Sequence, residues 1–257
     1  MAHEYDEVAG VVLAAGAGTR LAPLTQLRPK ALCPVAGRPL VDLALDRLAR
    51  ATTAHAVNLH HGSALLDAHL PAAVHRSREE HAALGTAGAL GALRPWLAGR
   101  SALVTNADAW LAPQLDLASF VDGWDRERVR LLCVVDPARG DFGDRRYCGV
   151  AILPWRTIAP LAPEPSGLYE VSWRAEAAAD RLDLVVHDGP FVDCGSPSDY
   201  LAANLLASGG SSVIDPGAVV AEGAELVRAV VWDHSEVASG ERLVDAIRAE
   251  GLTVLVR

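Results

Sequence analysis

Two cations and a glycine-containing loop follow the first apolar run of the chain. The run Val8–Leu13 has the composition of a buried parallel strand, and Gly16 and Gly18 come directly after it. Glycine lets the backbone approach a ligand closely and point several N–H groups at an anion. Arg20 can hold phosphate oxygens with its forked guanidinium, and Lys30 adds a compact second cation. We therefore predict a phosphate-binding loop in which Arg20 and Lys30 are the catalytic cations.

The spacing of the glycines separates this loop from two common nucleotide-binding motifs. The dinucleotide-binding fingerprint needs a third glycine at position 21, where this chain has Leu21. The Walker A motif needs a Gly-Lys-Ser/Thr triplet, which the sequence lacks. Both motifs are therefore excluded. Because a nicotinamide-dependent dehydrogenase would need the first motif, that class of enzyme is excluded as well.

Two aspartates stand where a divalent cation could be held. Asp108 follows Val104-Thr105-Asn106 at the carboxyl end of a predicted strand, which is where open α/β sheets bind ligands. Asp193 lies in a turn of small residues before a helix that begins near Pro197. Two carboxylates, completed by phosphate oxygens and water, suit the octahedral coordination of Mg²⁺. We predict that Asp108 and Asp193 are metal ligands and that Mg²⁺ is the cofactor.

Short β-branched runs alternate with longer Ala- and Leu-rich segments over most of the chain. After the first strand, predicted strands cover 56–59, 72–75, 101–105, 131–135 and 148–153, and predicted helices begin at Pro39 and cover 64–70 and 86–97. This alternation is typical of an α/β layered fold with a mostly parallel, Rossmann-like sheet.

The segment 211–257 follows a different pattern. Apolar residues recur every six positions, at Ile214, Val220, Leu226, Trp232, Ala238 and Val244. A six-residue period with glycine-containing turns is typical of a parallel β-helix, and two ordinary hairpins are the alternative. We predict a catalytic domain over 1–210 and a short, hexapeptide-repeat-like β-helix segment over 211–257 that serves as a structural or dimerising cap.

Composition limits the partners and the compartment. With 23 Lys+Arg and 32 Asp+Glu, the 257-residue chain has a formal net charge of −9, which disfavours a groove for a nucleic-acid backbone. Hydrophobic residues make up 51%, enough for a substantial core, yet no run of about 18 apolar residues could span a membrane. The four cysteines form no CxxC pair, and the stretch 3–7 is acidic where a signal peptide is basic. We expect a cytoplasmic protein with no nucleic-acid or membrane partner.

The glycine-containing loop and four further stretches resemble the sugar-1-phosphate nucleotidyltransferases. The loop reads LAAGAGTRLAPLTQLRPKALCPVAGRPL, and the others are VNLHH (57–61), LGTAGAL (84–90), VTNADAW (104–110) and FVDCGSPSDYLAANL (191–205). Enzymes of this family condense an NTP with a sugar 1-phosphate to give an NDP-sugar and pyrophosphate. The resemblance implies the nucleotide-diphospho-sugar transferase type of fold, and the hexads resemble the left-handed β-helix that many members carry. The VNLHH string is similar to the mannose-1-phosphate guanylyltransferase and N-acetylmuramate-1-phosphate uridylyltransferase branches.

The resemblance also implies roles for individual residues. Nucleotide contacts fall on Leu13, Ala14, Ala15, Gly16, Gly18, Thr19, Glu80, Gly85 and Thr86. Sugar contacts fall on Asn106, Gly149 and Glu170, and the metal ligands remain Asp108 and Asp193. Many thymidylyl- and glucosyl-type members have a Glu-Lys-Pro string near the sugar, whereas this chain has Asp141–Arg146, which weakens the expectation of a glucose-type substrate.

The expected reaction is an in-line attack by a sugar-phosphate oxygen on the α-phosphorus of the NTP. A phosphate monoester is largely dianionic at neutral pH, so no general base is needed. Because the Glu80 carboxylate can accept from guanine N1–H and N2–H₂ but would meet a carbonyl on uracil, we expect GTP with mannose 1-phosphate. The alternative reaction is UTP-dependent transfer to N-acetylmuramate 1-phosphate or another sugar 1-phosphate. The non-enzymatic alternative is a silent regulatory subunit that binds a nucleotide sugar. The C-terminal segment could join copies of the chain into a homo-oligomer.

Overall fold

A seven-stranded mixed sheet forms the centre of the protein. The computed structural model describes residues 8–112 and 115–256, so the acidic stretch 3–7 lies outside the described residues. The strand order is β10 (Leu182–Val186), β8 (Val129–Val135), β9 (Arg145–Leu153), β6 (Ser101–Asn106), β1 (Val8–Leu13), β4 (His55–Leu59) and β5 (His75–Arg78). Strand β9 runs antiparallel to β6 and β8, and the other neighbouring pairs are parallel. The prediction of a mostly parallel α/β sheet is confirmed.

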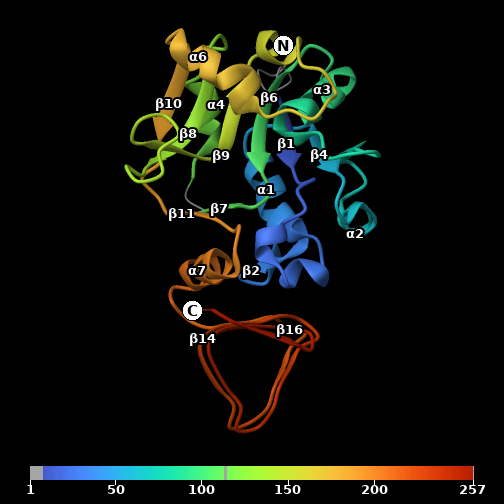
Figure 1. Cartoon of the computed structure of the whole chain (residues 1–257), viewed down its shortest axis with the longest axis vertical. Helices are drawn as coiled ribbons and strands as arrows, with labels where there is room; N and C mark the ends of the chain where they lie inside the picture. Colours follow the sequence, from blue (N-terminus) through green and yellow to red (C-terminus); the bar gives the residue numbers. More distant parts are fainter. Residues whose placement is uncertain (1–7, 113–114, 257) are drawn as a thin grey trace.

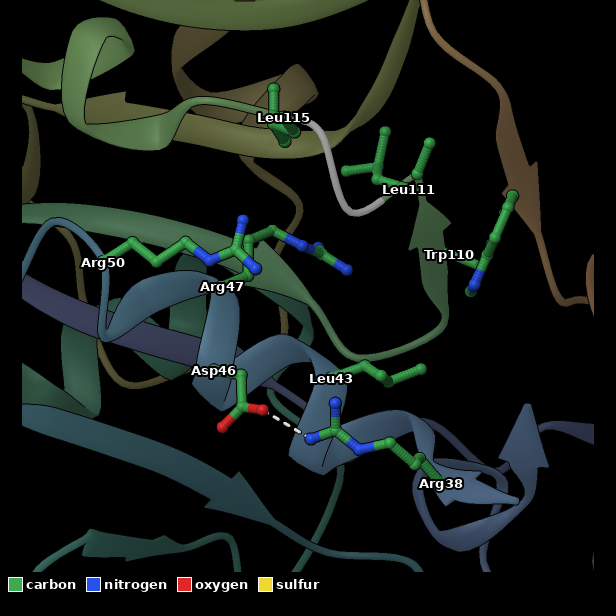
Figure 2. A pocket seen from close by; sticks show the side chains of 9 residues that line it. Arg38, Leu43, Asp46, Arg47, Arg50, Trp110, Leu111 and Leu115 are labelled. Atoms are coloured by element: carbon green, nitrogen blue, oxygen red, sulfur yellow. Dashed lines mark hydrogen bonds and ion pairs between the residues drawn. The ribbon is translucent and has the colours of Figure 1, made fainter. Parts of the chain in front are cut away.

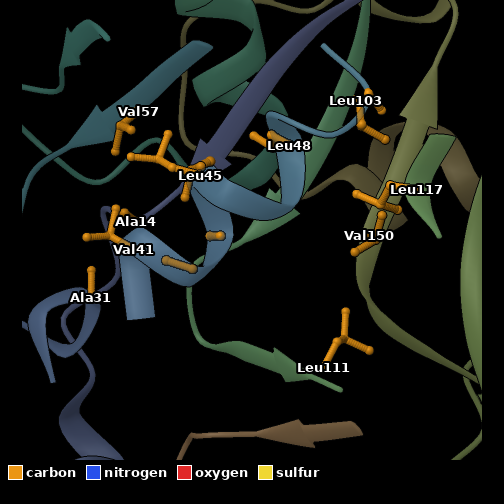
Figure 3. Packing of buried hydrophobic residues seen from close by; sticks show 14 of the residues in the cluster. Ala14, Ala31, Val41, Leu45, Leu48, Val57, Leu103, Leu111, Leu117 and Val150 are labelled. Carbon is orange, nitrogen blue, oxygen red and sulfur yellow. The ribbon is translucent and has the colours of Figure 1, made fainter. Parts of the chain in front are cut away.

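Both faces of the sheet are covered by helices. Helices α1 (Leu40–Leu48), α2 (Ser63–His69) and α4 (Leu117–Asp122) pack on one face, and α3 (Gly85–Leu97) and α5 (Trp155–Ile158) pack on the other. Successive strand residues point to opposite faces, so Val8 and Val12 join the first apolar cluster and Ala9 and Val11 join the second. Figure 3 shows part of the first cluster, with Leu45 of α1 among the strand side chains. Burial on both faces explains why these strands are apolar without alternation.

One predicted strand is misplaced. The prediction for 72–75 is wrong, because residues 71–74 form a turn in which the Val74 N–H donates to the Pro71 carbonyl (3.0 Å). Strand β5 starts at His75 instead and lies at the edge of the sheet, paired with β4. An edge strand with polar residues has no apolar run to reveal it in the sequence. No helix within residues 8–112 and 115–256 combines the length and hydropathy needed to cross a membrane.

The C-terminal segment folds into stacked β-helical coils. Its strands are β12 (Val213–Ile214), β13 (Val219–Val220), β14 (Glu225–Val231), β15 (Glu236–Val237), β16 (Arg242–Ala249) and β17 (Leu252–Leu255). Figure 1 shows triangular turns below the sheet. Val213 pairs with Val230 and Val230 with Ile247, so each coil advances by 17 residues, one fewer than three hexads. The β-helix-like prediction is confirmed, but the strict six-residue period drifts out of register, since Trp232 is buried whereas Ala238 is exposed.

The coils share an apolar core with the segment that follows the phosphate loop. In Figure 1, helix α7 (Pro197–Ala207) and strand β2 (Pro34–Val35), which pairs with β3 (Arg38–Pro39), lie between the coils and the large sheet. One cluster contains Leu21, Leu24 and Val35 together with Tyr200, Trp232 and Ile247. Arg28 adds polar contacts, because its guanidinium lies 4.5 Å from the Trp232 ring centroid and 3.0 Å from Asp233. The division of the chain at 210/211 remains a prediction.

Helix α3 packs directly on the backbone of the segment 162–168. A Cβ on Gly85, Gly88 or Gly91 would lie 2.5, 2.1 or 2.3 Å from the backbone carbonyl oxygens of residues 166, 164 and 162. Their spacing of three places the glycines on one face of the helix. These glycines therefore fix the position of the segment that leads into the π-helical turn Tyr169–Trp173.

Gly88→Ala is expected to destabilise the fold by about 1–3 kcal/mol, because the added methyl must displace the Glu164 backbone. This loss should outweigh the roughly 1 kcal/mol by which alanine favours a helix over glycine. Equilibrium urea unfolding measures the change. Gly251→Ala is the matched control, since no atom lies within 4 Å of a Cβ built there. Equal, small effects in the two variants would contradict the packing argument.

Candidate active site

The carboxyl ends of β1 and β6 bring the phosphate loop beside the turn that carries Asp108. Leu13 is in register with Asn106, and the Ala107 N–H donates to the Leu13 carbonyl (3.0 Å). Within the described part of the chain, the backbone N–H groups of residues 15–18 donate to no protein acceptor. They adjoin a small cavity whose lining includes Lys30 and Asp108. Adjacent unbonded N–H groups beside a cation suit an anion such as phosphate.

Lys30, the only lysine of the chain, is held firmly beside this loop. It begins a 3₁₀ turn directly after Pro29, whose ring packs on Gly62, where a Cβ would lie 2.3 Å from Pro29 Cγ. Gly18 has a φ of +61°, and a Cβ on it would lie 2.9 Å from Lys30 Cβ. Gly18 is therefore required both by its left-handed backbone and by the Lys30 stem. Only 10% of the Lys30 side chain is exposed.

Asp108 and Asp193 lie together although they are far apart in the sequence. Asp193 ends β11 (Phe191–Asp193), which pairs antiparallel with β7 (Ala109–Leu111), the strand that follows Asp108. The Lys30 ammonium bonds to Asp108 Oδ2 and lies 3.8 Å from Asp193 Oδ1. The two carboxylates thus share the Lys30 ammonium, and their remaining oxygens are suitable ligands for a divalent cation.

Arg20 approaches the same carboxylates from the solvent side. Its Nη2 lies 3.7 Å from Asp193 Oδ2, and 74% of its side chain is exposed. The guanidinium lies against Gly195, where a Cβ would be 2.9 Å from Nη2. The structure thus gathers Arg20, Lys30, Asp108 and Asp193, the four side chains for which catalytic and metal-binding roles are predicted.

The two aspartates fit a divalent cation whose other ligands come from the substrate and water. Among residues 8–112 and 115–256, no group of three or more His, Cys, Asp or Glu side chains is placed to hold a metal ion. The Asp108 and Asp193 side chains are 34% and 35% exposed, so their oxygens can be reached. Mg²⁺ is commonly bound by one or two carboxylates together with substrate phosphates and waters. This oxygen-only pair fits Mg²⁺ or Mn²⁺ better than zinc.

A buried arginine that the sequence analysis missed holds the turn that carries Asp108. Arg47 of α1 donates from Nη1 to Thr105 Oγ1 (2.6 Å) and from Nη2 to the Ala109 carbonyl (2.8 Å), which lie on either side of Asp108 in the sequence. Figure 2 shows Arg47 leaving α1 toward the strand that carries Trp110. Burial lowers the pKa of Arg47 to about 10, so the side chain stays charged at neutral pH. In the sequence Arg47 is indistinguishable from a solvent-facing residue of an amphipathic helix.

A larger cleft of about 590 Å³ lies on the other side of Asn106. Asn106 and Glu170, both predicted sugar contacts, line it, and Asp141 lies on its wall. Glu170 belongs to the π-helical turn, an irregularity often found at functional sites. Gly149, the third predicted sugar contact, is buried outside this lining, and a Cβ there would lie 2.5 Å from Ala109 Cβ. The charged residues among the described lining are therefore both carboxylates.

The second loop expected to contact the nucleotide lies between β5 and α3. Glu80 is exposed there, whereas its neighbour Glu79, which the sequence analysis missed, is buried. Gly85 begins α3, and the Thr86 hydroxyl accepts from the Leu168 N–H (2.8 Å). Thr86 thus connects this loop to the segment beside the larger cleft.

Comparisons with known proteins identify similar chains. The model of the nucleotidyl transferase family matches residues 9–139. The chain is 33% identical over 227 residues to the N-acetylmuramate alpha-1-phosphate uridylyltransferase of Caulobacter vibrioides, with 75% of this chain and 94% of the relative covered. It is 27% identical over 297 residues to the mannose-1-phosphate guanylyltransferase of Mycobacterium tuberculosis, with 96% and 81% covered. A crystal structure from Bacillus anthracis, described as a glucose-1-phosphate thymidylyltransferase, shares the fold with a TM-score of 0.65 at 18% identity, covering 78% of this chain and 95% of that one.

Lys30 offers a selective probe of the predicted metal site, because the chain has no other lysine. Reductive ¹³C-methylation keeps the positive charge and gives one lysine resonance beside that of the N-terminal amine. Titration with Mg²⁺ is expected to shift this resonance, since the cation competes with the ammonium for the Asp108 and Asp193 carboxylates. Asp108→Asn and Asp193→Asn should each raise the half-saturating Mg²⁺ concentration by about tenfold or more, roughly 1.4 kcal/mol.

Asp67→Asn is the control for this titration, because Asp67 pairs with Arg76 and Arg78 away from Lys30. It should leave the Mg²⁺ midpoint unchanged. A Mg²⁺ response that survives both active-site substitutions would contradict the metal assignment.

Proposed function

The chain belongs to the nucleotidyl transferase family and transfers a nucleotide from an NTP to a sugar 1-phosphate, and we propose that it uses GTP and mannose 1-phosphate. The similarity to the mannose-1-phosphate guanylyltransferase spans 96% of the chain and so reaches into the C-terminal coils. The similarity to the uridylyltransferase spans 75%. The guanylyltransferase therefore matches the chain in its C-terminal coils as well, although the uridylyltransferase is the more identical of the two, at 33% against 27%.

The observation that carries the choice of sugar is the charge of the larger cleft. Asp141 and Glu170 are the charged side chains among its described lining residues. Carboxylates accept hydrogen bonds from sugar hydroxyls, and they repel a second carboxylate. N-acetylmuramate carries a carboxylate on its lactyl ether, whereas mannose carries hydroxyl groups only. The acidic lining therefore favours the neutral hexose.

The base loop supports guanine. Both carboxylate oxygens of Glu79 accept hydrogen bonds from protein N–H groups, so Glu79 has little capacity left for a base. The exposed Glu80, five residues before Gly85, remains as an acceptor in this loop. Guanine presents two adjacent donors, N1–H and N2–H₂, whereas uracil presents a single N–H flanked by two carbonyls, so a carboxylate at this position favours GTP over UTP.

The site residues can support direct in-line transfer. An oxygen of the sugar phosphate attacks the α-phosphorus of the NTP, a new P–O bond forms, and the bond from the α-phosphorus to the bridging oxygen breaks, so that pyrophosphate leaves with the electron pair. The attacking phosphate is already anionic, and no side chain has to remove a proton. The main tasks are to hold two anions together and to stabilise charge on the transferred group.

Lys30 and Arg20 are the candidates for these tasks. Lys30 lies at the junction of the phosphate loop and the carboxylate pair, where its stem is fixed by Gly18. Arg20 is exposed and can turn from Asp193 toward the leaving pyrophosphate. Asp108 and Asp193 would hold Mg²⁺, which supplies additional positive charge on the phosphates when bound.

A pyrophosphate-release screen tests the proposal. Five NTPs are crossed with mannose, N-acetylmuramate, glucose and N-acetylglucosamine 1-phosphates in the presence of Mg²⁺. The highest kcat/KM is expected for GTP with mannose 1-phosphate. A higher value for UTP with N-acetylmuramate 1-phosphate would overturn the substrate assignment, and no turnover with any pair would favour the silent regulatory subunit.

Lys30→Met is expected to lower kcat by about 10²–10³, roughly 3–4 kcal/mol, by loss of a preorganised charge. Arg242→Met is the matched control, since Arg242 is an exposed cation on the coils that pairs with Glu225. The control should keep the wild-type kcat. Near-normal turnover of the Lys30 variant at saturating substrate would remove Lys30 from the catalytic set.

A further inference from the structure

Two buried polar side chains connect the phosphate loop to the base loop. Asn58 is the last residue but one of β4 and is 3% exposed, and Glu79 follows β5 and is 4% exposed. The Ala14 N–H donates to Asn58 Oδ1 (2.6 Å), and Asn58 Nδ2 donates to Glu79 Oε1 (2.7 Å). The Leu84 N–H donates to Glu79 Oε2 (2.8 Å). These three hydrogen bonds form a continuous relay from Ala14 to Leu84.

The two ends of the relay determine which side chains can form it. Both ends are backbone N–H donors, so the relay must present an acceptor at each end and one donor–acceptor pair in the middle. One amide and one carboxylate satisfy this requirement. Two amides would place two donors face to face, and two carboxylates would place two anions together. The combination of Asn58 and Glu79 is thus chemically specific.

The relay ends at the two loops where nucleotide contacts are predicted. Ala14 immediately precedes residues 15–18, whose N–H groups have no protein acceptor within the described residues. Leu84 immediately precedes Gly85 and is the N-cap of α3. A nucleotide bound by both loops spans a limited distance between its base and its phosphates, so its affinity depends on the separation of the loops.

We propose that Asn58 and Glu79 are positioning residues that hold these two loops at the separation required by the NTP. This inference rests on the proposed function, because it assumes that the triphosphate lies on the first loop and the base on the second. Asn58 and Glu79 act through the backbone of Ala14 and Leu84 and need not touch the nucleotide. Their loss should therefore weaken nucleotide binding and leave sugar-phosphate binding unchanged.

Reciprocal exchange of the two functional groups provides a sharp test. Asn58→Asp alone places two carboxylates in contact, and Glu79→Gln alone places two amides in contact. The double variant N58D/E79Q restores one amide and one carboxylate and can form all three hydrogen bonds. Each single variant should raise the Kd for GTP by about 10- to 100-fold, and the double variant should return to within about threefold of wild type.

Calorimetry with GTP and with UTP, each with Mg²⁺ and without sugar phosphate, measures the Kd values. Steady-state kinetics then separate the KM for the nucleotide, which should rise, from the KM for the sugar 1-phosphate, which should stay at the wild-type value. Asp67→Asn is the matched carboxylate-to-amide control, because Asp67 pairs with Arg76 and Arg78 of the same strand β5. If N58D does not fold, Asn58→Ala replaces it and should show the same nucleotide-selective loss.

Three outcomes would overturn the relay. In the first, the single variants bind GTP with the wild-type Kd. In the second, the double variant binds GTP no more tightly than the weaker-binding single variant. In the third, the KM values of both substrates rise equally. A failure of the proposed function gives a different result, because the wild-type protein itself then binds neither GTP nor UTP. In that case both proposals are wrong. Tight UTP binding by the wild type with the same selective loss in the variants would retain the relay and change only the base.

Discussion

The contact of the Lys30 ammonium with the Asp108 and Asp193 carboxylates is the interaction on which the rest of the site depends. Two carboxylates repel each other, and a nearly buried ammonium is costly unless its partners are fixed in place. Three separate elements meet to satisfy these conditions: the end of β6, the end of β11 and a 3₁₀ turn after Pro29. The fold therefore has to specify their relative positions closely.

Helix α1 and the C-terminal coils both support this contact. Arg47 holds both ends of the Asp108 turn from α1. Two residues before Lys30, Arg28 stacks on Trp232 of the coils, and the Trp232 indole N–H donates to the Tyr200 hydroxyl (2.9 Å). The C-terminal coils thus pack against the segment that presents Lys30. They give apolar packing partners to a stretch that has only short 3₁₀ turns of its own.

Local sequence features predicted the elements that carry the chemistry, and tertiary contacts determined the rest. The strand Val8–Leu13 was predicted with its observed bounds because it is apolar on both faces and ends in glycines. Glu79 and Glu80 are adjacent and identical in type, and only the direction of the chain leaving β5 decides which one is buried. The same is true of Arg47, since its inward orientation follows from the packing of α1 on the sheet. Side chains that position other residues are recognised by their neighbours in space, and the sequence alone gives no sign of them.

Charge is divided across the site in a way that matches a sugar 1-phosphate. Arg20, Lys30 and the unbonded N–H groups lie on the loop side of Asn106, together with Asp108 and Asp193, whose charge a bound metal ion would neutralise. The carboxylates of Asp141 and Glu170 lie on the cleft side. A sugar 1-phosphate is itself divided, with a dianion at one end and hydroxyl donors at the other, so it can satisfy both halves in one orientation only. The reversed orientation would place phosphate against carboxylates. The same division would penalise a sugar that carries its own carboxylate, and this is the physical reason for proposing a neutral hexose.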